Sequence, residues 1–315
     1  MQNKPELIVV AGPTASGKTA CAVELCRQIG GEVVSADSMQ IYRGMDILSA
    51  APTKEEMRGI PHHMLGVADP AEKYSAAMYR DRANEAIADI HARGKRAVVC
   101  GGTGLYINAL TRPLSFSERS DEKLHDELMA MADEPGGRRR LHSMLKEVDP
   151  ESAARLHEND VRRVARAIEI YRLTGVTQTE QAKIDAQREG DYHETIFALD
   201  WPRDVLYTRI GLRVDAMVRG GLIDEVRRLM REEEKYPTAA QAIGYKEIAA
   251  ALMCRMGMDE AIDLVKQATR NYAKRQLTWF RRDPRTVWIE AQGRSAEAIA
   301  CEMVQKLNKE KTGND

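Results

Sequence analysis

The chain has 315 residues, of which 43% are hydrophobic and 30% are charged, and its formal net charge is −1. These values are ordinary for a folded globular protein, and the near-zero charge does not by itself indicate a nucleic-acid partner. No apolar run approaches the roughly 20 residues of a membrane-spanning helix, residues 1–6 lack the architecture of a signal peptide, and the five cysteines form no C-x-x-C pair. We therefore expect a cytoplasmic protein with free thiols and no membrane partner, and neither a zinc site nor a disulfide framework is indicated.

The first expected element is a buried strand over 7–11, followed directly by a sequence of the form G-x-x-x-x-G-K-T. This is the phosphate-binding P-loop pattern, and here it consists of Gly12, Pro13, Thr14, Ala15, Ser16, Gly17, Lys18 and Thr19. Its backbone N–H groups and the N-terminus of the following helix can hold a phosphate, Lys18 can bind the outer phosphate oxygens, and Thr19 can hold Mg²⁺. A chance match is the alternative, but the flanking strand and helix argue against it. The motif predicts a bound di- or triphosphate and leaves open what is done with it.

Two further strands are expected over 32–36 and 97–100, with a helix over 75–92 between them and a loop region from 44 to 70. Strands that alternate with helices imply right-handed crossovers and a mainly parallel sheet. In such a sheet the ligand lies beyond the carboxyl ends of the strands. We therefore expect three loops to meet at one place: the P-loop, residues 37–40 and residues 101–104.

Asp37 follows the second expected strand and is the first candidate for acid–base chemistry. A carboxylate at this position can accept a hydrogen bond from an attacking nucleophile or take its proton; a helix cap or a salt bridge to Lys18 is an equally good reading. The third strand ends in Cys100-Gly101-Gly102, without the acidic residue that holds Mg²⁺ in many P-loop NTPases. That absence weakens the case for a standard ATPase or GTPase. It leaves a kinase, or a transferase in which the bound diphosphate is the leaving group.

The composition changes from about 113 to 190, where β-branched runs are few and Ala, Leu, Glu, Arg and Met are frequent. Helices are expected there over 121–132, 138–147, 150–156 and 160–173. After this segment we expect a strand over 195–199, helices over 203–218, 222–234 and 258–282, a last strand over 286–289 and a closing helix over 295–308. The predicted fold class is therefore α/β, with a P-loop NTPase-like parallel-sheet core formed by 1–112 and 195–315 and a mainly helical insertion domain over 113–194.

The expected helix over 258–282 carries a cationic face, because Lys266, Arg270 and Lys274 fall at i, i+4 and i+8. Its apolar face is marked by Ala261, Val265, Ala268, Tyr272 and Trp279. Between 266 and 285 there are seven cations and one anion, whereas 232–234 is an acidic run. A cationic face on a neutral protein suits a phosphodiester backbone; a solvated helix face with acidic partners elsewhere is the alternative. Local basic clusters at 138–140 and 162–166 add to this charge.

An ordered set of motifs across about 12–290 resembles the tRNA dimethylallyltransferase family, also called the tRNA isopentenyltransferase or IPP transferase family. The motifs lie at 12–19, 35–47, 61–63, 69–70, 74–76, 101–106, 157–160, 163–167, 243–245 and 273–280. The stretches ADSMQIYRGMDI at 36–47 and AKRQLTWF at 273–280 are far more specific than the P-loop.

The resemblance implies transfer of a dimethylallyl group from its diphosphate to N6 of the adenosine at tRNA position 37, just 3′ of the anticodon, with Mg²⁺ and with release of diphosphate. It implies that Asp37 orients or deprotonates the amine, that Thr19 with the P-loop amides holds the diphosphate and the metal, and that Arg213 stabilises the leaving group. The residues implied to contact tRNA are Asp37, Ser38, Met39, Gln40, Thr103, Arg162, Arg163, Arg166, Gln241, Gly244, Tyr245, Lys246, Arg270, Lys274 and Arg275. The implied partners are dimethylallyl diphosphate and the anticodon stem-loop of tRNA, and we expect a monomer.

The sequence departs from the family pattern at three places. Where the family has Gly-Thr-Ala-Lys before a proline, this chain has Leu-Ser-Ala-Ala at 48–51. The family's Pro-Gln pair is replaced by Val161-Arg162, and a family glutamine is replaced by Asn271. These changes affect expected tRNA contacts more than the expected chemistry. The alternatives are a small-molecule kinase that uses ATP, an enzyme that prenylates free AMP, and an RNA-binding regulator with a relic P-loop.

Overall fold

The computed structural model describes residues 4–114, 121–231 and 241–312. The chain divides into two compact units: Met1–Thr111 with Asp191–Asp315, called here the core, and Arg112–Gly190, called the insertion. The chain thus leaves the core once and returns to it once. The predicted contact of the inserted segment with tRNA stays a prediction.

The core is built on a six-stranded sheet with the order β3-β2-β4-β1-β5-β6, in which every neighbouring pair is parallel. The strands are β1 (Glu6–Ala11), β2 (Gly31–Ala36), β3 (His62–His63), β4 (Arg96–Gly101), β5 (His193–Asp200) and β6 (Thr286–Glu290). Central strands such as β1 are apolar and buried because helices cover both faces of the sheet. The predicted fold class, an α/β core on a parallel sheet, is confirmed.

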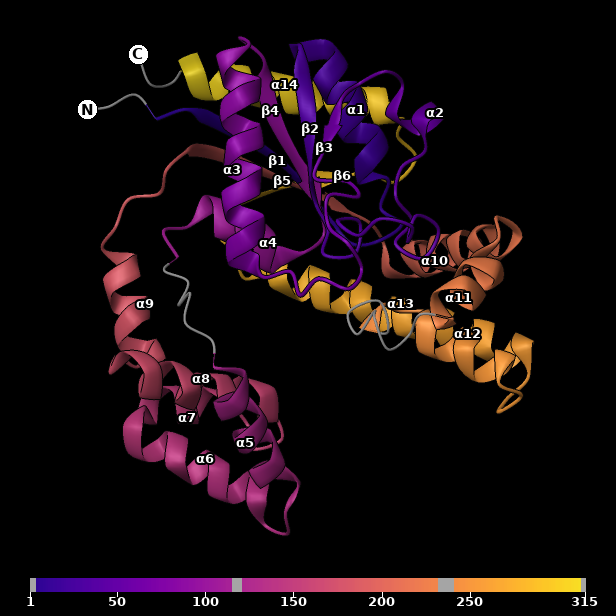
Figure 1. Cartoon of the computed structure of the whole chain (residues 1–315). Coiled ribbons are helices and arrows are strands. Elements are labelled where there is room, and N and C mark those ends of the chain that lie inside the picture. Colours follow the sequence, from indigo (N-terminus) through magenta and orange to yellow (C-terminus); the bar gives the residue numbers. More distant parts are fainter. Residues whose placement is uncertain (1–3, 115–120, 232–240, 313–315) are drawn as a thin grey trace. The chain divides into compact units, whose positions relative to one another are not determined.

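Two apolar layers enclose this sheet (Figure 1). On one face α1 (Lys18–Ile29) and α14 (Ala296–Thr312) pack together and bury residues such as Leu25 and Met303. On the other face α3 (Ala76–Ala92) contributes Tyr79 and Ile87. The helix α3 begins as predicted after Ser75, whose hydroxyl accepts a hydrogen bond from the Met78 N–H.

The remaining core helices are α2 (Lys54–Met57), α4 (Gly104–Thr111), α10 (Arg203–Arg219), α11 (Leu222–Met230), α12 (Tyr245–Leu252) and α13 (Met258–Arg281). Four elements were not predicted from the sequence: α2, α4, α12 and the short edge strand β3. The predicted helix over 222–234 is confirmed as α11 as far as residue 230, while its end and the acidic run 232–234 lie outside the described residues. None of the helices in the described ranges combines the length and apolarity that crossing a bilayer requires.

The insertion contains α5 (Glu122–Asp133), α6 (Gly137–Val148), α7 (Pro150–Arg155), α8 (Val161–Thr174) and α9 (Gln178–Ala186). The first four were predicted, and α9 was not. Leu128, Leu145 and Ile168 belong to a separate apolar core of this unit. The buried Asp149 carboxylate accepts hydrogen bonds from the N–H groups of Ser152 and Thr179 and so joins α7 to α9.

Candidate active site

The P-loop connects β1 to α1, and its backbone includes positive φ angles that few residue types adopt easily. Gly17 precedes the helix with φ 87° and, lacking a side chain, leaves the first N–H groups of α1 available to an anion. Ala15 has φ 61°, a left-handed conformation that is unusual for a residue other than glycine. At Gly12 an added Cβ would lie 2.9 Å from the Ser16 Oγ. This backbone leaves the N–H groups of the loop free of bulky side chains, and phosphate binding by the loop stays a prediction.

Side chains from the C-terminal half of the core hold the P-loop in place. The Thr14 N–H donates to the Gln276 Oε1 at 2.9 Å, and the Gln276 Nε2 donates to the Gly102 carbonyl at 3.0 Å. Arg209 donates from Nε to the Ala15 carbonyl at 2.8 Å. The buried Gln276 thus ties α13 to two of the three expected ligand-binding loops. Gln276 lies within the AKRQLTWF stretch, but no local pattern in the sequence distinguishes it from the exposed polar residues of the same helix.

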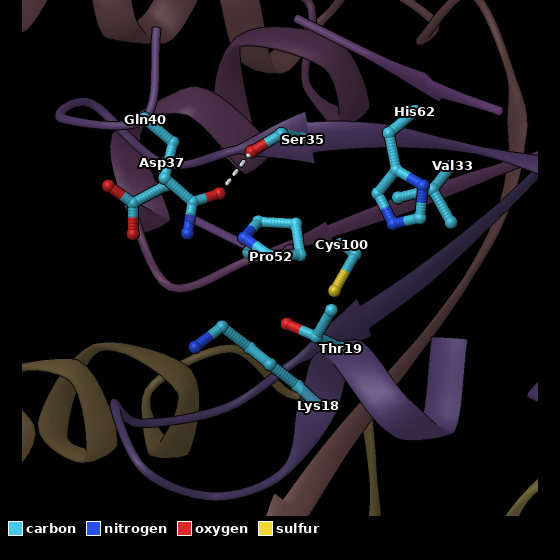
Figure 2. Close-up of a pocket in the computed structure, with 10 residues that line it drawn as sticks. Lys18, Thr19, Val33, Ser35, Asp37, Gln40, Pro52, His62 and Cys100 are labelled. Carbon is cyan, nitrogen blue, oxygen red and sulfur yellow. Dashed lines mark hydrogen bonds between the residues drawn. The ribbon is translucent and has the colours of Figure 1, made fainter. Parts of the chain in front are cut away.

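A pocket opens where the three loops meet (Figure 2). It is lined by Lys18, Thr19, Val33, Ser35, Asp37, Gln40, Pro52, His62, Cys100 and Gly101. The predicted convergence of the P-loop with the loops that follow β2 and β4 is therefore confirmed. At Gly101 an added Cβ would lie 2.1 Å from the Ala36 carbonyl oxygen, so the close approach of β2 and β4 at the pocket requires glycine.

Asp37 has one carboxylate oxygen engaged in its own loop. Its Oδ1 accepts a hydrogen bond from the Met39 N–H at 2.9 Å, and the Thr103 Oγ1 accepts one from the Ser38 N–H at 3.1 Å. Within the described ranges no ion pair joins Asp37 to Lys18. Of the two structural roles weighed from the sequence, neither a helix cap nor a salt bridge to Lys18 is found for Asp37 among the described residues; its Oδ1 instead closes a turn with Met39.

The pocket concentrates positive charge. Burial lowers the pKa of Lys18, and the nearby Arg213 guanidinium lowers it further. Burial also lowers the pKa of Arg213, while Asp37 opposes that change. Two cations that repel each other at one place favour an anionic ligand that would neutralise both.

The neutral groups of the pocket follow from burial as well. Burial raises the pKa of the Cys100 thiol to about 11, so the thiol stays protonated near neutral pH and is a poor nucleophile. Burial lowers the pKa of His62, whose Nδ1 lies 2.8 Å from the Ile60 carbonyl oxygen. The Nε2 of His62 is buried without a partner among the described residues.

Arg213 reaches the site from α10. Its Nη2 donates to the Ala50 carbonyl at 3.2 Å, and the same carbonyl accepts a hydrogen bond from the Gln40 Nε2 at 3.2 Å. Gln40 is held in turn through its Oε1, which accepts from the Ser35 Oγ at 2.9 Å. The structure therefore brings the three residues predicted to be catalytic, Asp37, Thr19 and Arg213, to one region of the core.

The cationic face predicted for α13 is only partly free. Lys266 forms an ion pair with Asp215 at 2.7 Å. Beyond the end of the helix, Arg285 pairs with Asp283 and Glu194 of the core. Arg270 is half-buried, whereas Lys274 and Arg275 are exposed.

The predicted apolar face of α13 was wrong in part. Ala261 and Val265 are buried, but Trp279 is 38% exposed, and the buried face continues instead through Ala273 and Phe280. Gly104 leaves the space that the Trp279 ring occupies, since an added Cβ would lie 2.3 Å from the ring.

The other predicted tRNA contacts are spread over both units. In the core, Gln241 and Lys246 are exposed, while Gly244 and Tyr245 are buried. Gly244 has φ 100° and precedes α12, which gives it a structural reason to be glycine. In the insertion, Arg162 and Arg163 are exposed on α8, and Arg166 forms an ion pair with the buried Glu169 at 2.7 Å.

Comparison with known proteins agrees with this geometry. The family model "IPP transferase" matches residues 40–283. A tRNA dimethylallyltransferase of Geobacter metallireducens is 47% identical over 307 residues, which are 96% of this chain and 98% of that protein.

Two solved structures share the fold. A full-length tRNA isopentenylpyrophosphate transferase of Bacillus halodurans is similar with a TM-score of 0.73 and 40% identity, over 99% of each chain. A eukaryotic dimethylallyltransferase acting on tRNA is similar with a TM-score of 0.80 and 28% identity, over 98% of this chain and 80% of that one. A chain that matches the family model over most of its length, and is this similar to full-length relatives, belongs to the IPP transferase family.

Proposed function

We propose that the enzyme transfers a dimethylallyl group from dimethylallyl diphosphate to N6 of the adenosine at tRNA position 37 and releases diphosphate. The observation that carries the proposal is the arrangement of Lys18 and Arg213 at the P-loop with Asp37 at the same pocket. The names of the relatives support the same reaction. A cytoplasmic location and a monomeric state are parts of this proposal.

The leaving group determines what the P-loop must do. Breaking the bond between the allylic carbon and oxygen places new negative charge on the departing diphosphate. Lys18, Arg213 and the backbone N–H groups at the start of α1 stabilise that charge as it develops, because they are already in place before the bond breaks. Lys18 and Arg213 repel each other when no anion lies between them, so binding of the diphosphate relieves this repulsion.

Asp37 serves the nucleophile. The N6 nitrogen of adenine forms a bond to the allylic carbon and must then lose a proton. The Oδ1 of Asp37 is held by the Met39 N–H at 2.9 Å, so the second carboxylate oxygen is the one that accepts a hydrogen bond from the amine and then its proton. A base in a folded RNA must leave its stack to reach this carboxylate.

Mg²⁺ fits this donor set. The Thr19 hydroxyl lines the pocket beside Lys18, and no group of three or more His, Cys, Asp or Glu side chains able to hold a metal occurs in the ranges that the structure describes. Mg²⁺ commonly binds through one or two protein oxygens together with phosphate oxygens and water. Thr19 would therefore hold the ion with the diphosphate, and the bound ion would supply further charge neutralisation.

Exposed cations on both units support an RNA partner. Lys274 and Arg275 on α13 lie on the core, and Arg162 and Arg163 lie on α8 of the insertion. Side chains of this kind bind phosphate groups and make affinity fall with salt concentration. We therefore expect tRNA affinity to decrease steeply between low and moderate salt.

The direct test incubates the protein with dimethylallyl diphosphate, Mg²⁺ and unmodified tRNA, and detects alkylated adenosine by mass spectrometry of the digested RNA. Asp37→Asn keeps an oxygen for the Met39 N–H but loses the base, so we expect transfer to fall by at least about 100-fold while tRNA affinity changes little. Asp46→Asn, at an exposed aspartate of the next turn, is the matched control. Absence of alkylated adenosine with the wild type, or full activity of Asp37→Asn, would contradict the proposal; phosphate transfer from ATP without RNA would favour a kinase.

A further inference from the structure

Glu225 is a buried carboxylate of α11 that serves a loop distant in sequence. Its Oε1 accepts a hydrogen bond from the Leu48 N–H at 2.7 Å, and its Oε2 accepts one from the Ile47 N–H at 3.1 Å. The residue is 6% exposed. Both oxygens of this buried carboxylate therefore accept hydrogen bonds from the backbone of one turn. Such charge-assisted hydrogen bonds are strong, and they offset the desolvation free energy of burying the charge.

A second residue of α11 contacts the same loop. The Arg228 Nη2 donates to the Gly44 carbonyl at 2.6 Å and lies 3.9 Å from the Glu225 carboxylate. The loop therefore contacts α11 at two points, Gly44 and 47–48. We call Glu225 and Arg228 the α11 clasp.

The clasped loop has a turn that needs support. Ala50 has φ 48°, in the left-handed region, which is unfavourable for a residue with a Cβ. Backbone hydrogen bonds within the loop, from Ala50 N–H to the Ile47 carbonyl at 2.9 Å and from Ala51 N–H to the Asp46 carbonyl at 2.8 Å, close the turn. The carbonyls that close the turn belong to residues 46 and 47, and Glu225 binds the N–H groups of residues 47 and 48. Glu225 therefore holds the start of this turn.

One carbonyl of the turn is shared by two side chains of the site. The Ala50 carbonyl accepts hydrogen bonds from the Arg213 Nη2 and the Gln40 Nε2, each at 3.2 Å. A shift of the turn would move this shared acceptor and with it the guanidinium. Glu225 is thus linked to Arg213 through a single fixed segment of backbone.

We propose that Glu225 is a positioning residue for the transfer reaction: by fixing the 44–50 loop it sets the Ala50 carbonyl that orients Arg213 toward the departing diphosphate. The inference rests on the role of Arg213 in the proposed function. It predicts that Glu225 acts on the diphosphate through Arg213 and does not act on tRNA binding.

The test is a double-mutant cycle of Glu225→Gln and Arg213→Gln, read in two ways: the kcat of transfer and the Kd for inorganic diphosphate. Alone, Glu225→Gln should lower kcat and weaken diphosphate binding, each by about tenfold, with tRNA affinity unchanged. In the Arg213→Gln background the same substitution should change both by less than roughly twofold, because the residue that it positions is already absent. Asp224→Asn, an exposed neighbour on α11, is the matched control and should change neither.

Equal fold-changes in both backgrounds, or a loss of tRNA affinity, would overturn the positioning role. If Glu225→Gln does not fold, as judged by circular dichroism, Glu225→Asp takes its place in the cycle, because it keeps the charge and shortens the reach by one methylene. Failure of the proposed function is distinguishable, because the wild type would then form no alkylated adenosine, whereas failure of the clasp leaves wild-type transfer intact.

Discussion

Replacement of Gln276 by methionine tests whether one buried amide holds the P-loop. Methionine has a similar length and no strong hydrogen-bonding group, so it fills the space but leaves the Thr14 N–H and the Gly102 carbonyl without their partner. An unsatisfied buried backbone group costs about 1–3 kcal/mol. Gly102 is buried and Thr14 is half-exposed, so water can replace only one of the two hydrogen bonds. We expect a loss of about 1–3 kcal/mol in the free energy of unfolding.

The measurement is urea-induced unfolding followed by far-ultraviolet circular dichroism. Gln267→Met, at an exposed glutamine of the same helix, is the control and should change the unfolding free energy by less than about 0.5 kcal/mol. We also expect weaker binding of inorganic diphosphate to Gln276→Met, because the loop amide at Thr14 is then free to reorient. A loss no larger than that of the control would refute the reasoning that this side chain supports the cradle.

Three further results follow from the structure. Gly101→Ala should cost about 3 kcal/mol of stability, since its Cβ would lie 2.1 Å from the Ala36 oxygen, whereas Gly211→Ala, inside α10 with nothing within 4 Å, should not destabilise the protein in the same urea titration. Hydrogen bonds, chiefly those from Arg93, lower the pKa of the buried Glu32 carboxyl from 4.5 to about 2. The resulting stability, about 3 kcal/mol, is therefore present above pH 4.5 and should be lost as the pH falls toward 2, a loss that Glu32→Gln should remove from the pH–stability curve. Cys100 should resist iodoacetamide at pH 8 in the folded protein while the exposed cysteines react, and its labelling in the native state would contradict the raised pKa.

The central strands and the P-loop could be predicted because their signals are local. An apolar run such as 7–11 is buried on both faces, and the glycines that follow it match the backbone angles that the cradle requires. The edge strand β3 consists of two histidines paired with Val33 and Val34 of β2, so no apolar run indicated it. The helices α4 and α12 are eight residues each, which is short for recognition from periodicity.

The site was harder to predict wherever a side chain has a distant partner. The count of cations on α13 did not distinguish Lys266, which pairs with Asp215 of another helix, from Lys274, which is exposed. Gln276 and Glu225 both bond to backbone groups more than a hundred residues away, and no spacing in the sequence records such a pair. Residue type and order indicated the chemistry, but the residues that hold the catalytic groups in place required the fold.

The order of the strands has a consequence for how the protein is made. β1 lies between β4 and β5, and α1 packs against α14, the helix at 296–312. A ribosome releases the P-loop early, but its strand gains its second neighbour, β5, only after the whole insertion has emerged, and its helix is covered by α14 later still. The insertion has an apolar core of its own and can fold during synthesis. The nascent N-terminal segment therefore keeps apolar surface exposed until β5 and α14 have been synthesised.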